Sequence, residues 1–355
     1  MRNSIIALFV LIWLSALAAE HFPTPQLPFA PLSYICYQAT GSIVIDGKME
    51  EADWLKAPWT EDFTDIEGNL KPQPFYQTRV KILWDDKGMY FFAWMEEEHI
   101  WAKLTERDAV IFYDNDFEIF IDPNGDTHEY YELEINALGT LWDLFLIKPY
   151  RDEHSALDAW DIRDIEYSIG LAGTLNDPSD IDRYWTVEMF IPWKALAQRA
   201  HMPVPPKDKD YWRINFSRVH WDTEIINNEY VKIPGKPEYN WVWSPQGLIA
   251  MHYPERWGFV VFSHQAPGTE HPEFQIPLRE HAKEYLRQLY YLQKQYFMDH
   301  GRYARNLRQL KARPFVQNNI RHTPKFETTS RCFHIFLDGK NSFEAVQIRS
   351  DGLCR

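Results

Sequence analysis

The sequence is poor in cysteine and in basic residues, and each shortage excludes a class of protein. Three cysteines in 355 residues are too few for a disulfide-rich scaffold. The 37 Lys and Arg residues are outnumbered by 51 Asp and Glu, which gives a formal net charge of −14. An acidic chain repels phosphate backbones, so nucleic acid is not an expected partner. Beyond residue 19 no apolar run is long enough to span a bilayer.

Several motifs of well-known enzyme and cofactor sites are also missing. The sequence has no Gly-rich phosphate loop, no Walker motif and no Ser-centred nucleophile elbow. It has neither Cys-x-x-Cys nor His-x-Glu-x-x-His. A His and Met pair such as Met95 with His99 could ligate haem in a β-sandwich. A His that is exposed or satisfied by neighbours is the commoner alternative.

The N-terminus has the pattern of an export signal. Arg2 precedes an apolar run from Ile5 to Ala19 that ends in small residues. This order is typical of a secretory signal peptide. An uncleaved anchor is the alternative, but the run is shorter than the ~20 residues of a spanning helix. The sequence therefore predicts a signal peptide over residues 1–19, a secreted or periplasmic protein, and no membrane span after signal cleavage.

The middle of the chain has the pattern of a β-rich domain. A Pro-rich lead-in over residues 20–33 precedes a run of short alternating segments over residues 34–263. Residues 79–84 and 89–94 flank a turn and predict a hairpin. Further strands are expected at 117–121, 131–135, 165–169, 185–189, 212–216 and 257–262, and a Pro-started helical turn at 192–196. The pattern predicts a mainly β fold, a two-sheet antiparallel β-sandwich of the jelly-roll or immunoglobulin-like kind.

The C-terminal part differs in composition. Residues 264–280 are rich in Pro and are expected to form a linker, and residues 281–355 are expected to form a small α+β appendage. A helical pattern runs to residue 300, and Gly301 suits its C-terminal cap. A short helix is expected at 307–310 and strands at 332–337 and 343–348. In an exported protein Cys332 and Cys354 could form a disulfide, and three reduced cysteines are the alternative.

Acidic residues gather between positions 108 and 134. Glu118 and Phe120 are expected to face one way on their strand, and Glu132 and Glu134 share a face of theirs. Three interpretations remain open. Paired carboxylates could hydrolyse glycosides, and an oxygen-rich loop with Asp122 and Asp126 could bind structural Ca²⁺. A solvated acidic surface is the third.

The abundance of aromatic residues, 16% of the chain, is a more distinctive signal. Residues 240–247 place Asn240, Trp241, Trp243 and Gln246 in a strand followed by a turn. Such a mixture suits a sugar site, because a pyranose lays its C–H face on a ring while its hydroxyls need polar partners. The alternative is that these Trp residues belong to the core.

The order of several motifs resembles a known family. These are Asp46-Gly47 with Trp54, residues 78–85 with Tyr90, residues 116–122, residues 185–188 with 191–193, and residues 215–219, 240–247 and 252–258. Together they resemble carbohydrate-binding module family 9, in a subgroup of exported bacterial proteins, over about residues 36–262.

The resemblance implies a β-sandwich that holds the ends of sugar chains between two aromatic rings. It implies one ring at Trp243 with Asn240 beside it, and the other at Phe112 or Tyr113. Glu118 would bind hydroxyls, and structural Ca²⁺ is common in the family. The sequence departs from well-studied members at Glu134, near Asn136, where those members carry an Arg.

The segment over residues 290–310, with Asp351-Gly352 near the end, is similar to the post-helix part of type IV pilin-like proteins. The leading hypothesis for the whole chain is non-catalytic binding of carbohydrate in carbohydrate uptake or breakdown. The alternatives are a glycoside hydrolase acting on O-glycosyl bonds and a haem-binding electron-transfer domain. The sequence leaves the oligomeric state open.

Overall fold

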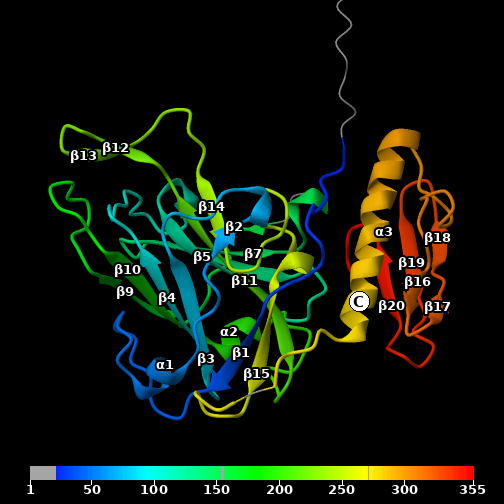
Figure 1. Ribbon diagram of the computed structural model, residues 1–355, viewed down its shortest axis with the longest axis horizontal. Helices are drawn as coiled ribbons and strands as arrows, with labels where there is room; N and C mark the ends of the chain where they lie inside the picture. The colour runs from blue at the N-terminus through cyan, green and yellow to red at the C-terminus, as the bar shows by residue number, and fades with distance from the viewer. Residues whose placement is uncertain (1–20, 153–155, 271) are drawn as a thin grey trace, which may run out of the picture.

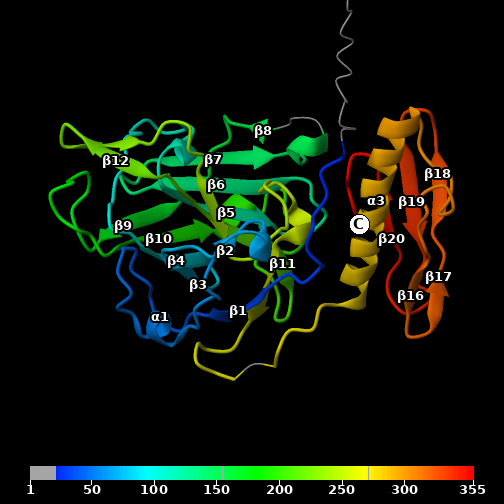
Figure 2. The ribbon, with the colours of Figure 1, turned by 45° about the horizontal axis from the view of Figure 1, so that its top comes forward.

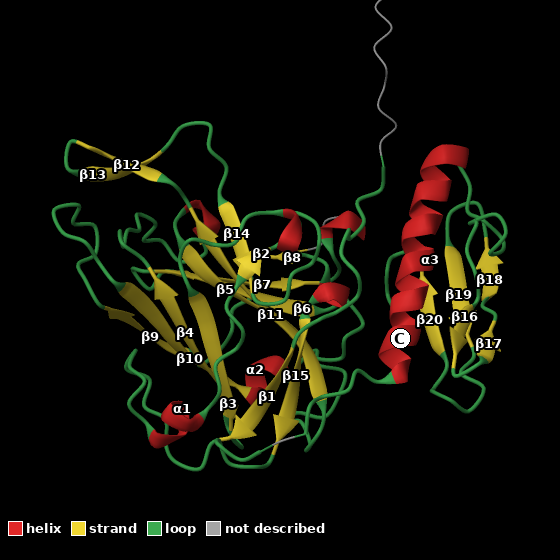
Figure 3. Cartoon of the chain, viewed as in Figure 1, coloured by secondary structure: helices red, strands yellow, loops and turns green. Residues whose placement is uncertain are grey.

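The computed structural model describes residues 21–152, 156–270 and 272–355, and the predicted signal peptide lies outside this range. A large β-domain and a smaller C-terminal unit lie side by side, and helix α3 (Leu278–His300) and the C-terminal residues face the β-domain (Figure 1). The backbone N–H of Cys354 donates to the carbonyl of Asp126 at 3.2 Å. Strand dominates the β-domain, whereas the smaller unit combines one long helix with short strands (Figure 3).

Within the described residues the β-domain has one curled sheet of 13 strands and a separate two-stranded sheet of β12 (Thr223–Ile226) and β13 (Glu229–Lys232). Eleven form a continuous path, in the order β8 (Ala156–Leu157), β7 (Leu141–Leu146), β6 (Tyr130–Asn136), β5 (Asp116–Asp122), β11 (Tyr211–His220), β15 (Gly258–Ser263), β1 (Ser33–Gln38), β3 (Thr78–Trp84), β4 (Gly88–Glu96), β10 (Tyr184–Pro192) and β9 (Glu166–Leu171). Strand β14 (Tyr239–Val242) branches from β11 and pairs with β2 (Thr64–Asp65). The helices are short: α1 (Ala52–Lys56) and α2 (Trp193–Leu196).

The sheet curls so that its two halves pack face to face. The ring of Phe91 on β4 lies 5.9 Å from the ring of Phe216 on β11, across the main core. Figure 2 shows β5, β6 and β7 as one layer and β4, β9 and β10 as the other. The predicted β-sandwich is therefore confirmed. Strand β1 joins the layers, and it pairs in parallel with both β15 and β3, which the local sequence pattern did not predict.

The predicted hairpin is formed by β3 and β4, and the Pro-started turn is α2. The opening motif of the domain is fixed by one buried carboxylate. Glu188 on β10 accepts hydrogen bonds from Trp54 Nε1 at 2.8 Å and from the backbone N–H groups of Asp46 and Gly47 at 2.9 Å. Two motifs far apart in the sequence therefore meet at this glutamate.

The C-terminal unit packs α3 against small sheets. These are β18 (Lys325–Thr328), β19 (Phe333–Leu337) and β20 (Val346–Arg349) in one sheet, with β16 (Phe315–Gln317) and β17 (Ile320–His322) in another. Gly301 caps α3 at a φ of 65°, as predicted. Residues 307–310 form turns, so the helix expected there is wrong. The proposed disulfide is absent from the described residues, where the exposed Cys332 and the buried Cys354 are both free thiols.

Candidate functional site

One face of the β5–β6 sheet carries the acidic residues. Alternation along a strand sends every second side chain to the same face. On β5 this face holds Asp116, Glu118 and Phe120, and on β6 it holds Glu132 and Glu134. The opposite face holds apolar side chains of the main core: Phe117, Ile119, Ile121, Leu133 and Ile135. Core packing therefore fixes which way the carboxylates point.

Strand register brings like charges close together. Glu118 lies directly opposite Glu134, and Glu134 lies opposite Trp142 on β7. Oxygen atoms of Asp116, Glu118 and Glu134 lie within 4.8 Å of one another. Like charges opposite each other destabilise a sheet. The interpretation as a solvated acidic surface is wrong at these positions, because the three side chains are only 0–5% exposed.

A cavity of about 190 Å³ opens over this face, and we call it the sheet-face cavity. Its walls contain both rings and polar groups, contributed mainly by β5, β6, β7, β14 and the loops beside them: Phe112, Glu118, Phe120, Glu132, Glu134, Trp142, Tyr150, Val219, Glu238, Asn240, Met251 and His252. The combination of flat apolar surface and converging hydrogen-bonding groups is what a small polar ligand needs.

Three of the predicted site residues meet at this cavity, namely Phe112, Glu118 and Asn240. Phe112 lies in the turn η2 (Ile111–Tyr113), and hydrogen bonds to both its backbone N–H and its backbone carbonyl fix its position. Its N–H donates to Glu134 Oε2 at 2.9 Å, and its carbonyl accepts from Trp221 Nε1 at 2.8 Å. The neighbouring Tyr113 is 53% exposed and does not line the cavity.

Trp243 is not a surface ring, and the role expected for it is wrong. Its side chain is 0% exposed and belongs to the main core. The indole Nε1 donates to Glu61 at 2.9 Å, and a Cβ at Gly258 would overlap the ring. Trp241 and Trp243 were expected to point to the same side of the strand, and both do belong to the main core, but neither ring is exposed.

Gln246 and Asn136 are also structural residues. Gln246 is 0% exposed, and its amide nitrogen contacts Met251 Sδ at 2.9 Å. Asn136 is 0% exposed and uses both amide atoms locally. It donates to Leu104 O at 2.9 Å and Asp114 Oδ2 at 3.0 Å, and it accepts from Thr140 N at 3.0 Å. Neither side chain faces the sheet-face cavity.

Two partly exposed rings of the cavity, Trp142 and Tyr150, were not predicted. Trp142 lies on β7, where alternate residues face the acidic side of the sheet. The alternation over residues 141–146 was a usable signal for this strand. Tyr150 lies in the turn η3 (Tyr150–Asp152), with its ring 4.3 Å from that of His252. Only the fold brings this turn over the cavity.

The electrostatics of the cavity floor reflect burial. Burial raises the pKa of Glu118 to about 7. Burial and the charge of Glu118 raise the pKa values of Asp116, Glu132 and Glu134. Both effects are expected from the geometry, because buried carboxylates close to one another are poorly solvated and repel each other's charge. The floor of the cavity therefore has a strong need for hydrogen-bond donors, protons or a cation.

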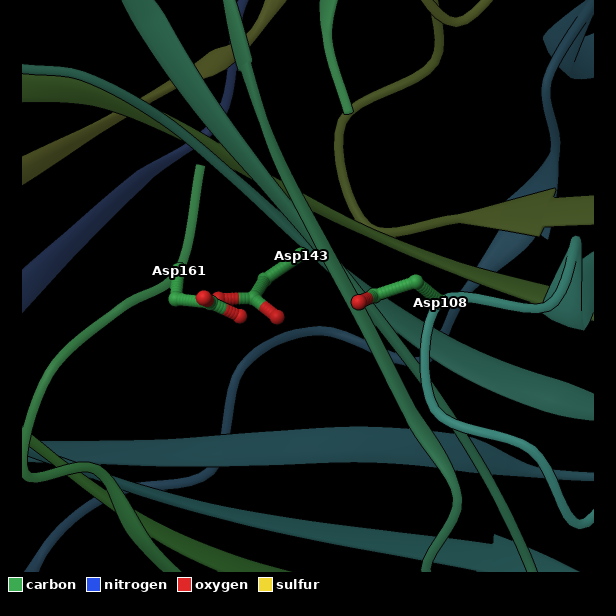
Figure 4. A group of neighbouring side chains, drawn as sticks. All are labelled: Asp108, Asp143 and Asp161. Carbon is green, nitrogen blue, oxygen red and sulfur yellow. The ribbon is translucent and has the colours of Figure 1, made fainter. Parts of the chain in front are cut away.

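The second acidic cluster, shown in Figure 4, has an arginine among its carboxylates. It consists of Asp108, Asp143 and Asp161. Arg107 forms ion pairs with all three, at 3.3 Å to Asp161 and 3.8 Å to Asp108, with the closest contact to Asp143. The charge of this cluster thus already has a partner.

The predicted Ca²⁺ loop uses its oxygens for other bonds. Asp122 accepts from Gly125 N at 2.9 Å and Thr127 N at 2.8 Å. Asp126 accepts from His128 N and from Arg355 Nε, both at 2.9 Å. These bonds stabilise a turn, and the Ca²⁺ site expected at these two residues stays a prediction.

The haem ligand pair is also contradicted. Met95 is 0% exposed in the main core, whereas the ring of His99 is bonded to the hydroxyl of Tyr230 at 3.1 Å. A haem would have to displace the core to reach the sulfur of Met95.

A second, larger hollow of about 620 Å³ lies on the other side of β14. Asn240 borders both hollows, and the second is lined by rings such as Phe75, Tyr239 and Trp241. Two of its charged groups are paired with each other, Lys236 with Asp222 at 2.8 Å, and so are Lys71 and Glu67, at 3.1 Å.

Comparison with protein families gives a match over the middle of the chain. Residues 45–205 match the family described as carbohydrate family 9 binding domain-like. The matched segment includes the Asp46-Gly47 and Trp54 motif, the acidic strands and Glu188. No curated protein matches the chain. The pilin-like resemblance of the C-terminal segment receives no support.

Solved structures that are similar to this chain include one described as a candidate carbohydrate-binding protein, from Bacteroides uniformis. It has a TM-score of 0.49 and 17% identity, and the alignment covers 66% of this chain and 100% of that one. A family 9 carbohydrate-binding module from Caldicellulosiruptor kristjanssonii is similar in its complex with cellotriose (TM-score 0.42, 16% identity, 68% of this chain and 100% of that one). The same holds for its complex with glucose (TM-score 0.43, 17% identity, 67% and 100%).

Among the described residues, no helix combines the length and the apolarity needed to cross a bilayer.

Proposed function

We propose that this chain binds carbohydrate without catalysis, and that the sheet-face cavity is the binding site. The observation that carries the proposal is the convergence of Phe112, Trp142 and Tyr150 with Glu118 and Asn240 around one hollow. Four of these five residues lie inside the segment that matches the family 9 model, and Asn240 lies beyond it.

Each group has a distinct part in the proposed site. A ring of Phe112, Trp142 or Tyr150 offers a flat apolar surface to the C–H face of a pyranose. Carboxylate and amide groups at Glu118, Glu134 and Asn240 can accept or donate hydrogen bonds to adjacent hydroxyls. The volume of about 190 Å³ suits one sugar ring with the rest of a chain outside. We expect a role in carbohydrate uptake or breakdown, outside the cell or in the periplasm.

The arrangement of the carboxylates favours binding over hydrolysis. A glycosidase places two carboxyl groups on opposite sides of the scissile bond, about 5–9.5 Å apart. Here Glu118 and Glu134 stand side by side on one sheet face, with oxygens within 4.8 Å. A sugar would lie on top of this pair rather than between its members.

The first test is a glycan array, which shows whether the chain binds any sugar. Calorimetric titration with glucose and cellotriose then measures the affinity. We expect a Kd in the micromolar to millimolar range, about −8 to −4 kcal/mol. Trp142→Ala should lose about 1–3 kcal/mol, by analogy with other planar rings that stack on aromatic side chains. Phe75→Ala is the matched control, because Phe75 is an exposed ring that lines the other hollow.

Unchanged affinity in Trp142→Ala, with binding lost in Phe75→Ala, would move the site to the second hollow. An array without any ligand, on protein shown to be folded by circular dichroism, would reject carbohydrate binding altogether.

A further inference from the structure

The floor of the sheet-face cavity has more negative charge than its protein surroundings balance. Asp116, Glu118 and Glu134 are 0%, 5% and 2% exposed, and one oxygen of each lies within 4.8 Å of the others. In the part of the chain that the structure describes, no Lys or Arg forms an ion pair with any of the three. The charges that act on Asp116 and Glu134 come from other carboxylates.

One of these carboxylates also has an oxygen without a hydrogen-bond partner. Asp116 Oδ1 accepts from Val219 N at 3.1 Å, but Asp116 Oδ2 is buried and unpaired. The adjacent Glu132 is 4% exposed, and its Oε2 is likewise unpaired. An unpaired buried acceptor costs about 1–3 kcal/mol, and more when it is charged. Such atoms call for a ligand that the protein itself does not supply.

The cluster around Asp143 provides an internal comparison. There the same number of carboxylates gathers around Arg107, which forms ion pairs with all three. The Asp116 cluster is more buried and has no such cation among the described residues. A bound ion can take the place that Arg107 occupies in the other cluster.

We propose that Asp116, Glu118 and Glu134 bind one hard divalent cation of the Ca²⁺ kind on the floor of the sheet-face cavity. Ca²⁺ takes roughly six to eight oxygen ligands at about 2.3–2.6 Å. Oxygens up to 4.8 Å apart can therefore surround a single ion. The ligand set contains neither His nor Cys, which does not suit Zn²⁺. These residues are different from the Asp122 and Asp126 pair, whose oxygens are already bonded.

The ion would face the ligand cavity, because Glu118 and Glu134 line it. Three carboxylates leave coordination positions open on that side. Two neighbouring hydroxyls of a sugar ring stacked on Trp142 could fill them. With three carboxylates and one divalent ion the site keeps a negative charge, so it should prefer neutral sugars to uronic acids. This second part rests on the proposed function, whereas the ion site itself does not.

The ion site is tested by calorimetric titration of the metal-free full chain with Ca²⁺, and by Tb³⁺ luminescence. Tb³⁺ replaces Ca²⁺ in oxygen sites, and Trp142, directly opposite Glu134, is placed to sensitise its emission. We expect one saturable site whose Tb³⁺ emission Ca²⁺ displaces. Glu134→Gln and Asp116→Asn should each raise the Kd for Ca²⁺ at least about tenfold, or about 1.4 kcal/mol.

Asp161→Asn is the matched control, because it removes a carboxylate from the cluster that is paired with Arg107. It should leave Ca²⁺ binding unchanged. In EDTA, Glu134→Gln should melt at a higher temperature than the wild type, because it removes like-charge repulsion. This readout also establishes that the variant folds.

Absence of saturable Ca²⁺ binding, or equal binding in wild type and Glu134→Gln, would overturn the ion site. If Ca²⁺ binds and sugar affinity is the same in EDTA, the ion site stands and its contact with the sugar is rejected. If Ca²⁺ binds and no sugar does, the proposed function fails and the ion site survives.

Discussion

Trp243→Ala is expected to lower the free energy of unfolding by about 3–5 kcal/mol, the range for removal of a large buried ring. Trp243 is fully buried, and its ring lies 5.9 Å from that of Phe216. The substitution also removes the donor to Glu61. Urea denaturation followed by circular dichroism measures the loss directly. Sugar affinity of the remaining folded protein should be close to that of the wild type.

Tyr113→Ala is the control for this prediction. Tyr113 is 53% exposed, so its removal should change the free energy of unfolding by less than about 0.5 kcal/mol. A small stability loss in Trp243→Ala combined with a large loss of sugar affinity would contradict the core location. It would return Trp243 to the role of a binding ring.

Glu255→Gln is expected to cost about 3–5 kcal/mol of stability, because it removes the nearest counter-charge of the buried Arg151 and leaves it with the more distant Asp152, at 3.5 Å. The guanidinium of Arg151 reaches both oxygens of Glu255, at 2.9 and 3.0 Å. Tyr291 on α3 also donates to Glu255, at 2.5 Å. The pair therefore lies at the contact between the β-domain and the C-terminal unit. Its loss should lower the unfolding midpoint in urea and weaken that contact.

Glu344→Gln is the matched control for charge removal. Glu344 pairs with Arg279 at 3.8 Å, but its side chain is 89% exposed. Exposed pairs contribute about 0–1 kcal/mol, so little change is expected. The double variant Glu255→Gln with Arg151→Met should be more stable than Glu255→Gln alone, because it removes the unpaired charge. A double variant less stable than both single variants would show that the pair is not what the single substitutions disrupt.

The same pair predicts a dependence of stability on pH. Burial by itself would raise the pKa of Glu255, but the charges of Arg151 and Arg287, with the hydrogen bond from Tyr291, together lower this pKa to about 2. A lowered pKa in the folded state means that the unfolded state binds more protons. The contribution of Glu255 is therefore present above its ordinary pKa of 4.5 and is lost as the pH falls from there to about 2. Thermal melts across this range should fall less steeply for Glu255→Gln than for the wild type.

Part of the site was predictable because it depends on local alternation. The two-residue period placed Glu118 and Phe120 on one face, and Glu132 and Glu134 on another, before their partners were known. The pairing of β5 with β6 then puts these side chains on one face of the sheet, with Glu118 opposite Glu134. The sequence period alone could not reveal that pairing, because a shift of one residue reverses every side chain of a strand.

The aromatic residues mark the boundary of what local pattern can decide. Trp243 and Trp142 both lie in alternating segments beside polar residues. One is fully buried and the other borders the sheet-face cavity. Burial is set by which layer packs over a residue, and that layer comes from distant parts of the chain. The composition signalled a surplus of rings, but it could not say which of them remain accessible.

The sequence by itself determined the mainly β class, the extent of most strands, the long C-terminal helix and the concentration of carboxylates near position 118. Each depends on periodicity or composition, which are local properties. Only the tertiary structure decided that the sheet is continuous through the parallel strand β1 and that Trp243 is core. It also decided that Phe112, Trp142, Tyr150 and Asn240 surround one cavity. The cavity residues are up to 128 positions apart in the sequence, from 112 to 240, and β1 pairs with β15 across 226 positions, from Ser33 to Phe259. Pairing at such separations leaves no trace in the local pattern.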